Sequence, residues 1–495
     1  AQLIDLRQGR TSPHGPFAPV ARSEFGETME TMTSEPMMSE PIRTTNPATG
    51  EVLAEYRVHS PHDIATTIDT AHRRFATWRR TSFEQRADRL RHVASILEER
   101  TDEWAALMAL EMGKPVREGR AELAKSAWVC RYYADDGAAM LADRVVPTEA
   151  ARSFVHHEPL GVVLAVMPWN VPFWQAVRCA APTLMAGNTV VLKHASNVTG
   201  VAIALEELFA TAGFESGCFS SIVAPSSSVA AAIEHPGVRA VTLTGSDAAG
   251  RAVAPTAGPQ LKKVDLELGG SDPSIVLADA EVGAAADGCA TGRLVNGGQS
   301  CIGAKRFIVH EAVYERWLDA FTEAMGARRV GDPLDESTDI GPLARRDLRD
   351  ELHDQVLRSV DAGAHLHLGG ELPDDRATAY YAPTILTEVP TGSAAWTEEL
   401  FGPVAAVVRV GSTDDAIELA NGSPYGLGAA LYTADTEAGA VLAAERIEAG
   451  TVFVNAPVAS DPRLPFGGIK DSGYGRELGR EGVVEFVNVK TVSVA

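Results

Sequence analysis

The chain has 495 residues, of which 45% are hydrophobic and 22% are charged, and its 66 acidic residues outnumber its 44 basic residues. This length and composition are typical of a globular protein with more than one domain. The formal net charge of −22 excludes nucleic acid and anionic membrane surfaces as partners, because the chain would repel both. No apolar run approaches the roughly 20 residues that a membrane helix needs, so we expect a soluble protein.

The first 42 residues differ in composition from the rest of the chain. Residues 1–42 are rich in Pro, Ser, Thr, Met and Glu and have no apolar periodicity, which predicts a disordered or loosely attached leader. They lack the basic start and the apolar core of roughly 7 to 15 residues that a secretory signal requires. The five cysteines are an odd number without Cys-x-x-Cys spacing, so a reducing cytoplasm is expected and no metal site is indicated.

A regular spacing of apolar residues begins in the segment 64–112. Apolar residues recur at helical spacing over 64–75, 83–100 and 101–112, which predicts amphipathic helices. Short apolar and β-branched runs then alternate with helical segments, which predicts parallel βαβ units in a doubly wound α/β sheet. The strands of this sheet are expected at 162–167, 189–192, 219–223, 240–244 and 264–268.

A second α/β alternation follows in the C-terminal half of the chain. Strands are expected at 274–277 and 306–310, and a helix at 311–327. The last stretch, 483–494, alternates as a strand, and its edge would be sticky unless it were paired. We therefore expect an oligomer.

One cysteine has a context that differs from the others. Cys301 follows the glycine-containing segment 296–300, where the backbone can approach a ligand closely and the thiol is expected to be exposed. The other four lie in helical or apolar runs and are expected to pack as small hydrophobic residues: Cys130, Cys179, Cys218 and Cys289. A thiolate that attacks a carbonyl needs an oxyanion donor, a base and an acceptor for the leaving group.

Short motifs surround Cys301 in one order along the chain. Each alone is weak, because Phe-Gly-Gly and Gly-Ser occur in many loops. The motifs are Pro168-Trp169-Asn170, Lys193, Thr244-Gly245-Ser246, Glu267-Leu268-Gly269-Gly270, Glu399-Leu400-Phe401-Gly402-Pro403 and Pro465-Phe466-Gly467-Gly468. Together, at these separations, they resemble the NAD(P)-dependent aldehyde dehydrogenase superfamily from about residue 43 onward.

The resemblance implies an α/β aldehyde dehydrogenase-like fold. It has a Rossmann-like cofactor domain, an α/β catalytic domain and a small β oligomerisation element. The expected parts are a leader at 1–42, the cofactor-binding domain at 43–136 and 160–270, the catalytic domain at 271–471 and the oligomerisation element at 137–159 and 472–495. A homodimer or a homotetramer is expected.

The resemblance also assigns catalytic roles. Cys301 would attack the aldehyde to form a thiohemiacetal, and the Asn170 amide and the Cys301 backbone N–H would hold its oxyanion. One such donor contributes on the order of 2.7–4 kcal/mol. Glu267 resembles the general base that activates water to hydrolyse the resulting thioester. The alternative for Glu267, a surface carboxylate, does not explain an acid inside the apolar run 264–268.

No Gly-x-Gly-x-x-Gly fingerprint follows a strand, so the usual Rossmann signature is absent. The resemblance instead places the pyrophosphate near Gly245 and Ser246, at a helix start whose free N–H groups and dipole favour an anion. It places Glu399 at the nicotinamide ribose, with Phe401 packing nearby, and Trp169 also at the cofactor.

Lys193 resembles the lysine that contacts the adenosine ribose. Family members that prefer NAD often carry Glu three residues after it, and this chain has Ser196 there. A carboxylate would repel the 2′-phosphate of NADP, whereas Ser196 does not. We therefore expect NADP to be accepted, alongside NAD.

The segments 193–198, 458–461 and 466–470 look most like those of bacterial succinate-semialdehyde dehydrogenases. Arg178 follows Asn170 by eight residues, a little over two helical turns, so both side chains are expected on similar faces of the intervening helix. The resemblance makes Arg178 a clamp for the substrate carboxylate. A structural salt bridge is the equally open alternative.

One feature of those enzymes is missing. A second carboxylate-binding arginine found six residues before the nucleophile in some of them is Val295 here, and Arg293 is two positions off. Ser460 and Arg463 are candidates to replace it. The aromatic pair 173–174 leaves room for an aromatic aldehyde.

The sequence therefore predicts NAD(P)-dependent oxidation of an aldehyde to an acid, with succinate semialdehyde as the leading substrate. An aromatic or another aliphatic aldehyde is the alternative substrate. A CoA-acylating enzyme is less favoured, because Glu267 supplies a hydrolytic base that this route does not need. An inactive structural homologue is disfavoured by the joint presence of Asn170, Glu267 and Cys301.

Overall fold

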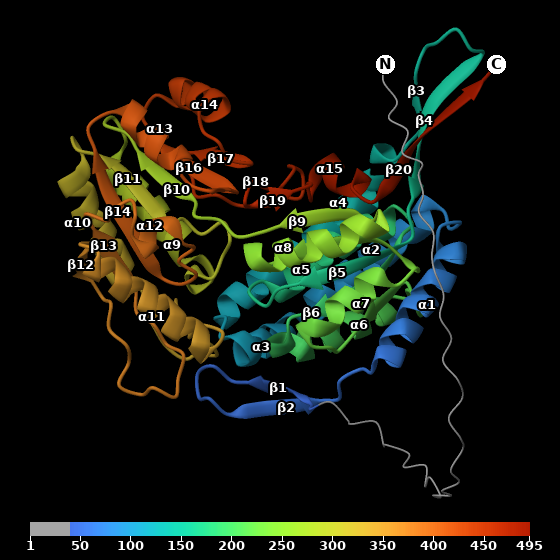
Figure 1. The fold of residues 1–495 in the computed structure, drawn as a ribbon, viewed down its shortest axis with the longest axis horizontal. Helices are drawn as coiled ribbons and strands as arrows, with labels where there is room; N and C mark the ends of the chain where they lie inside the picture. The colour runs from blue at the N-terminus through green and yellow to red at the C-terminus, as the bar shows by residue number, and fades with distance from the viewer. Residues whose placement is uncertain (1–39) are drawn as a thin grey trace, which may run out of the picture. The chain divides into compact units, whose positions relative to one another are not determined.

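Two large β-sheets and a three-stranded ribbon organise residues 40–495, the part of the chain that the computed structural model describes (Figure 1). Residues 1–39, which hold most of the predicted leader, lie outside the described residues. The described part opens with a two-stranded sheet of β1 (Ile42–Thr45) and β2 (Val52–Tyr56). Among the described residues, no helix is long and apolar enough to cross a membrane.

The first large sheet has the strand order β19-β9-β8-β5-β6-β7. Its five parallel strands are β5 (Val162–Met167), β6 (Thr189–His194), β7 (Phe219–Ser221), β8 (Val238–Thr244) and β9 (Lys263–Glu267). All five predicted strands are confirmed, with ends that differ by a few residues. The short β19 (Gly473–Tyr474) pairs antiparallel with β9.

Helices cover both faces of this sheet because successive side chains of its strands point to opposite faces. Val162 and Leu164 of β5 pack on the side of the first group of helices, whereas Ala165 and Met167 pack on the side of the second. The first group is α1 (Pro61–Trp78), α7 (Val229–Glu234) and α8 (Asp247–Ala257). The second is α2 (Phe83–Glu99), α3 (Thr101–Met112), α4 (Val116–Met140), α5 (Pro172–Met185) and α6 (Thr199–Thr211).

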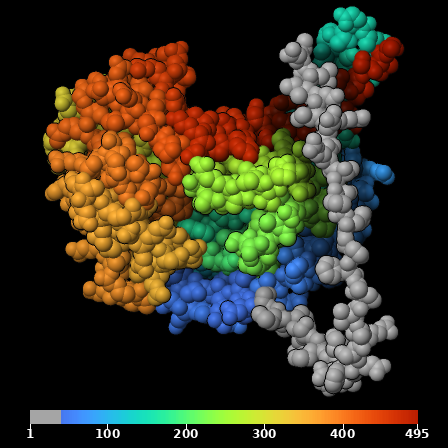
Figure 2. Space-filling model, in the orientation of Figure 1, coloured from blue at the N-terminus to red at the C-terminus, as the bar shows by residue number. Residues whose placement is uncertain are grey.

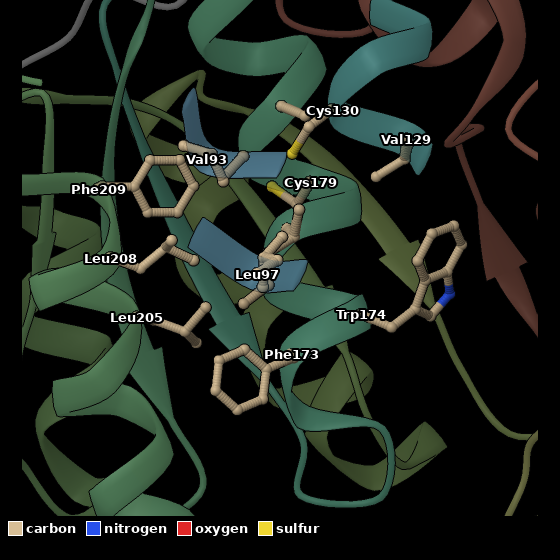
Figure 3. Packing of buried hydrophobic residues seen from close by; sticks show 14 of the residues in the cluster. Val93, Leu97, Val129, Cys130, Phe173, Trp174, Cys179, Leu205, Leu208 and Phe209 are labelled. Carbon is tan, nitrogen blue, oxygen red and sulfur yellow. The ribbon is translucent and has the colours of Figure 1, made fainter. Parts of the chain in front are cut away.

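The predicted helices at 64–75, 83–100 and 101–112 are confirmed as α1, α2 and α3. The second group of helices shares one apolar core, in which side chains from α2, α4, α5 and α6 meet (Figure 3).

Strand order also creates a topological switch point. From β5 the chain proceeds to β6 and β7 on one side, and then returns to place β8 and β9 on the other side of β5. The loops after β5 and β8 therefore diverge at the carboxyl edge of the sheet. In open α/β sheets this divergence forms a crevice in which ligands bind.

The second large sheet has the order β12-β13-β14-β11-β10-β16-β17, parallel except for the edge strand β12. Its strands are β10 (Pro273–Val276), β11 (Arg306–His310), β12 (His365–Leu368), β13 (Thr384–Thr387), β14 (Val404–Val410), β16 (Gly428–Tyr432) and β17 (Thr451–Val454). Its helices are α9 (Val282–Leu294), α10 (Tyr314–Gly326), α11 (Arg346–Asp361), α12 (Ala394–Thr397), α13 (Thr413–Asn421) and α14 (Thr436–Glu445). The strands expected at 274–277 and 306–310 and the helix expected at 311–327 are confirmed as β10, β11 and α10.

The ribbon has the order β20-β4-β3 and joins distant parts of the chain. All eight residues of β20 (Val487–Val494) pair antiparallel with β4 (Arg152–Pro159), and β3 (Arg144–Val145) completes it. The atoms of β4 and β20 lie side by side in Figure 2, at the end of the ribbon. The prediction of one strand over 483–494 is wrong at its start, because α15 (Gly479–Val484) is a helix and the strand begins at Val487.

One further two-stranded sheet is present among the described residues. Strand β15 (Tyr425–Gly426) pairs antiparallel with β18 (Ile469–Lys470).

Candidate active site

The loop that carries Cys301 runs from α9 to β11 and is bent by three consecutive residues with positive φ. Asn296, Gly297 and Gly298 have φ values of 55°, 62° and 78°. A Cβ at Gly298 would collide with the backbone of Gly402, so the loop can pass only if this residue is glycine. These glycines bend the loop tightly. The bend places Cys301 on the walls of two neighbouring cavities of the protein.

Cys301 is partly exposed, whereas the four other cysteines are buried, as expected from their contexts. Burial raises the pKa of the Cys301 thiol to about 11, and the charges of Lys305 and Arg178 oppose this rise. Lys305 is itself wholly buried and donates to the backbone carbonyls of Ser300 and Cys301 at 2.8 and 2.6 Å. A positive charge is therefore fixed beside the thiol, which favours the thiolate.

Asn170 lies in the loop after β5 and is buried. Its Nδ2 donates to the Gln299 carbonyl at 2.9 Å, and the Asn296 side chain in turn donates to the Asn170 carbonyl at 2.8 Å. An amide nitrogen has two hydrogens, so one remains to donate to a ligand. Asn170 and Cys301 line the same cavity.

Glu267 is the last residue of β9 and is almost completely buried, and neither carboxylate oxygen has a hydrogen-bond partner within residues 40–495. Burial raises the pKa of the Glu267 carboxyl well above its usual range, and the negative charges of Asp265 and Glu477 raise it further. Glu267 lines neither cavity, because its carboxylate lies against Gly467, where a Cβ would strike it. It is therefore close to the site but withdrawn from the cavity wall.

The first cavity, of about 470 Å³, lies at the switch point of the first sheet. Its lining includes Trp169 and Asn170 after β5, Gly245 and Ser246 after β8, and Glu399 and Phe401 from the second sheet's side. The rings of Trp169 and Phe401 meet edge-to-face, with centroids 5.6 Å apart.

Helix α8 starts at this cavity, and the Ser246 hydroxyl caps it by accepting from the Ala249 N–H at 3.3 Å. Glu399 Oε1 accepts from the Gly270 N–H at 3.0 Å and pairs with Lys305 at 3.1 Å. A Cβ at Gly269 would collide with Glu399 Oε2, so only glycine lets the Glu399 carboxylate lie against this backbone.

Lys193 and Ser196 lie at the same sheet edge but outside the lining of the first cavity. Lys193 is the penultimate residue of β6, in register with Val166 of β5, and Ser196 begins the short 3₁₀ turn that follows. Burial lowers the pKa of Lys193. The adenosine end expected from the sequence would therefore extend along the edge from β8 to β6.

The second cavity, of about 250 Å³, lies on the other side of the nucleophile, between α4, α5 and the loop before Phe466. Its lining includes Cys301, Arg178, Trp174, Ser460, Val295 and Lys125. Cys301 is thus on the wall of both cavities.

The model of the aldehyde dehydrogenase family matches residues 34–492. The chain belongs to the aldehyde dehydrogenase family. A probable succinate-semialdehyde dehydrogenase [NADP(+)] of Synechocystis sp. is 49% identical, with 92% of this chain and all of that protein covered. Succinate-semialdehyde dehydrogenase [NADP(+)] 1 of Mycobacterium tuberculosis is 48% identical, with the same coverage.

Solved structures share the fold. A succinic semialdehyde dehydrogenase from Streptococcus pyogenes, in complex with NADP+, superimposes with a TM-score of 0.89 at 36% identity, covering 92% of this chain and 99% of the other. A structure of Gox0499 gives a TM-score of 0.90 at 40% identity, covering 92% and 100%. The α/β aldehyde dehydrogenase fold and the oxidoreductase class predicted from the motifs are confirmed.

Arg178 of this aldehyde dehydrogenase is buried and forms an ion pair with Glu477. Its guanidinium also lies 4.9 Å from the centroid of the Phe466 ring. The salt bridge foreseen as an alternative is present, and the residue still lines the second cavity. The expectation that Arg178 and Asn170 share a helix face is wrong, because α5 begins at Pro172, after Asn170.

The other substrate candidates differ in position. Ser460 lines the second cavity and accepts a hydrogen bond from Lys125 Nζ at 2.7 Å. Arg463 lies outside the lining of both cavities, is largely exposed and pairs with Asp461 at 2.7 Å. Arg293 is fully buried and donates to the Gly298 carbonyl at 2.7 Å, so it supports the nucleophile loop.

Phe173 and Trp174 diverge although they are neighbours in sequence. Phe173 packs in the apolar core against Trp104, with ring centroids 5.2 Å apart, and does not line the second cavity. Trp174 lines it and lies apart from Phe173 in Figure 3. Only one of the two expected aromatic residues therefore faces the candidate substrate.

Lys125, Lys305 and Asn296 were not predicted from the sequence. Lys125 lies on α4, far along the chain from the motifs, and no local pattern distinguishes it from a solvated helix lysine. Lys305 and Asn296 lie within a few residues of Cys301, so closeness to the nucleophile was the available signal.

Proposed function

We propose that this enzyme oxidises succinate semialdehyde to succinate with NADP, and that NAD is a second acceptor. The observation that carries the proposal is that Cys301 lies where two cavities meet. One can receive a cofactor while the other receives an aldehyde. The names of the relatives from Synechocystis and M. tuberculosis support both the substrate and the cofactor.

The residues of the first cavity fit a nicotinamide dinucleotide. Glu399 lines this cavity and its carboxylate suits ribose hydroxyls, and the start of α8 at Gly245 and Ser246 suits a pyrophosphate. Lys193 and Ser196 at the end of β6 would hold the adenosine ribose, and no carboxylate at position 196 repels a 2′-phosphate. When bound, the cofactor supplies the hydride acceptor.

In the proposed mechanism, the Cys301 thiolate attacks the aldehyde carbon and the carbonyl electron pair moves to the oxygen. The remaining Asn170 amide hydrogen and the Cys301 backbone N–H donate to that oxyanion. After oxidation the acyl group is a thioester on Cys301. Glu267 then accepts a proton from the water that attacks the thioester, and the Cys301 thiolate leaves.

Glu267 lies outside the cavity wall, so its carboxylate must approach the Cys301 thioester before it can act in hydrolysis. Burial and the neighbouring negative charges raise its pKa, so a smaller fraction of molecules carries the carboxylate that acts as a base than for an exposed glutamate. We propose that its side chain moves from Gly467 to the cavity wall for hydrolysis.

The assembly and the division into parts also belong to this proposal. We infer that residues 43–136 and 160–270 bind the cofactor, that 271–471 carry the catalytic loop, and that the ribbon joins subunits in a homodimer or a homotetramer. Exposed Val145 and Val489 on the ribbon support such an interface. A cytoplasmic location agrees with five free thiols.

The test is steady-state kinetics with a panel of aldehydes and both cofactors. Succinate semialdehyde with NADP is expected to give the highest kcat/KM and to yield succinate. Benzaldehyde is included because Trp174 lines the second cavity. Equal or better turnover of benzaldehyde would overturn the substrate, and formation of an acyl-CoA when CoA is added would overturn the hydrolytic mechanism.

A further inference from the structure

Two residues of the described chain, 40–495, line both cavities: the nucleophile Cys301 and Gln175. Gln175 lies near the start of α5 and is only 2% exposed. Its neighbour Trp174 lines the second cavity alone. The Gln175 amide is therefore a buried polar group at the junction where the two cavities meet.

This amide is left without a hydrogen-bond partner. Within residues 40–495, Gln175 Oε1 is buried and accepts no hydrogen bond, and Nε2 donates none. A buried amide without partners is unfavourable relative to an apolar side chain of the same size. A group of this kind therefore needs a reason for its place, and a catalytic role is one such reason.

Helix α5 directs the amide toward the catalytic loop. Helical side chains lean toward the N-terminal end of their helix, so Gln175 leans toward the loop that holds Asn170. Gln175 and Arg178 are three residues apart and lie on one face of α5. The Arg178 guanidinium donates to Thr244 Oγ1 at 3.4 Å, so this face packs over the end of β8.

The two amides beside the nucleophile differ in the donors that they have left. Asn170 Nδ2 already donates to the Gln299 carbonyl at 2.9 Å, so one of its hydrogens remains for a ligand. Gln175 Nε2 keeps both of its hydrogens. Asn170, Gln175 and Cys301 line the first cavity together, so a carbon bonded to the Cys301 sulfur faces a wall that holds both amides.

We propose that Gln175 Nε2 donates a hydrogen bond to the oxygen of the reacting carbon, as a third donor beside the Asn170 amide and the Cys301 backbone N–H. This inference deepens the proposed function and rests on its covalent mechanism. The carbonyl electron pair moves to this oxygen when the thiolate forms the S–C bond, and again when water attacks the thioester. Gln175 transfers no proton in either step and stabilises the negative charge on the oxygen.

The approach of Glu267 explains why a further donor is useful. As a carboxylate close to the thioester, Glu267 repels the negative charge that forms on the oxygen. A neutral amide stabilises that charge without forming an ion pair that would hold Glu267 away from the water.

The main experiment is Gln175→Met, which replaces the amide by an apolar side chain of similar length. The rates of the NADPH burst and of acyl-enzyme hydrolysis, followed by stopped flow and by mass after rapid quench, are each expected to fall about 10- to 100-fold. The loss should be the same for succinate semialdehyde and benzaldehyde, because the reacting oxygen is common to both. Unchanged rates, or a loss in only one of the two steps, would contradict the inference.

Alkylation of Cys301 separates an effect on the oxyanion from an effect on the thiol or the fold. Iodoacetamide reacts with a thiolate by displacement of iodide, so no negative charge develops on an oxygen at the attacked carbon. Its rate in Gln175→Met is expected to stay within about threefold of that of the unmodified enzyme. If alkylation slows as much as the burst does, Gln175 acts on the thiol and the inference is wrong.

Cys179→Ala is a matched control on the same helix. Cys179 is buried one turn beyond Gln175 and lines neither cavity, so both rates are expected to stay within about twofold. Gln175→Glu is a second test variant, because it preserves the shape of the side chain and replaces Nε2 by an oxygen. Its burst rate is expected to fall as in Gln175→Met, and an unchanged burst rate would contradict the inference.

The proposed function and this inference fail in different ways. If the unmodified enzyme gives neither an NADPH burst nor an acyl adduct on Cys301, the covalent mechanism is wrong. If it gives both and Gln175→Met keeps the rates of the unmodified enzyme, the mechanism stands and the role of Gln175 is wrong.

Discussion

The two cavities that meet at Cys301 are built in different ways. The first is made by loops at the ends of strands and by glycines that permit close approach of neighbouring groups, at Gly269 and in the Cys301 loop at Gly298. The second is made by long side chains from α4, α5 and a distant loop. Backbone architecture thus prepares the cofactor side, whereas individual side chains decide what enters the substrate side.

The largest effect is expected when Cys301, which lines both cavities, is replaced. Cys301→Ala should lower kcat for aldehyde oxidation at least about 10³-fold, because the nucleophile is lost to both half-reactions. Binding of NADP, measured by fluorescence quenching, should persist. Undiminished turnover would refute the covalent mechanism.

Substitution of Glu267 should separate the two half-reactions, aldehyde oxidation and thioester hydrolysis, in a kinetic experiment. Glu267→Gln is expected to lower steady-state kcat by about 10²- to 10⁴-fold, while a burst of one NADPH per active site remains in a stopped-flow trace. The high pKa of Glu267 also means that thioester hydrolysis in the unmodified enzyme should accelerate as the pH rises and the carboxylate forms. A variant that loses the burst as well would assign Glu267 to the first step.

Asn170 faces the first cavity and is expected to act on the aldehyde oxygen. Asn170→Ala should lower kcat/KM by about 10²- to 10³-fold for every aldehyde, since it removes one oxyanion donor. The loss should be equal for succinate semialdehyde and for butanal, an uncharged aldehyde with the same number of carbons. An unequal loss would mean that Asn170 contributes to substrate choice.

Ser196→Glu tests the cofactor side alone. A carboxylate there should raise KM for NADP by about tenfold or more through repulsion of the 2′-phosphate. KM for NAD and the aldehyde preference should hardly change. If NADP and NAD respond alike, the adenosine ribose lies elsewhere.

The smallest expected effect concerns a residue predicted from the sequence to bind substrate. Arg463→Ala should change kcat/KM for succinate semialdehyde by less than about twofold, because an exposed ion pair with Asp461 contributes little. A loss of tenfold or more would show that this loop closes over the second cavity during turnover.

The sequence predicted the first cavity better than the second for a physical reason. Glycine turns and strand ends are local features, so the positions of Gly245, Glu267 and Cys301 follow from short motifs and strand periodicity. The partners of Arg178 and Lys125 come from segments hundreds of residues apart. Neither Glu477 nor Ser460 has a local pattern that reveals which cation it contacts.

The same distinction applies to the fold. Most of the parallel strands were predictable because they are short runs rich in apolar and β-branched residues. The start of the last strand was not, because residues 483 and 484 are apolar in both a short helix and a strand. Packing of α15 against α4 and α5, which no local pattern encodes, decides between them.

The burial of four of the five thiols leaves one thiol of the enzyme accessible to chemical reagents. Cys130, Cys179, Cys218 and Cys289 are buried, and only Cys301 of the five is partly exposed, beside the Lys305 ammonium. A small alkylating reagent should therefore add once to each folded chain. The fraction of chains whose mass shows that single adduct would give the fraction of functional subunits in a preparation, without the use of a substrate.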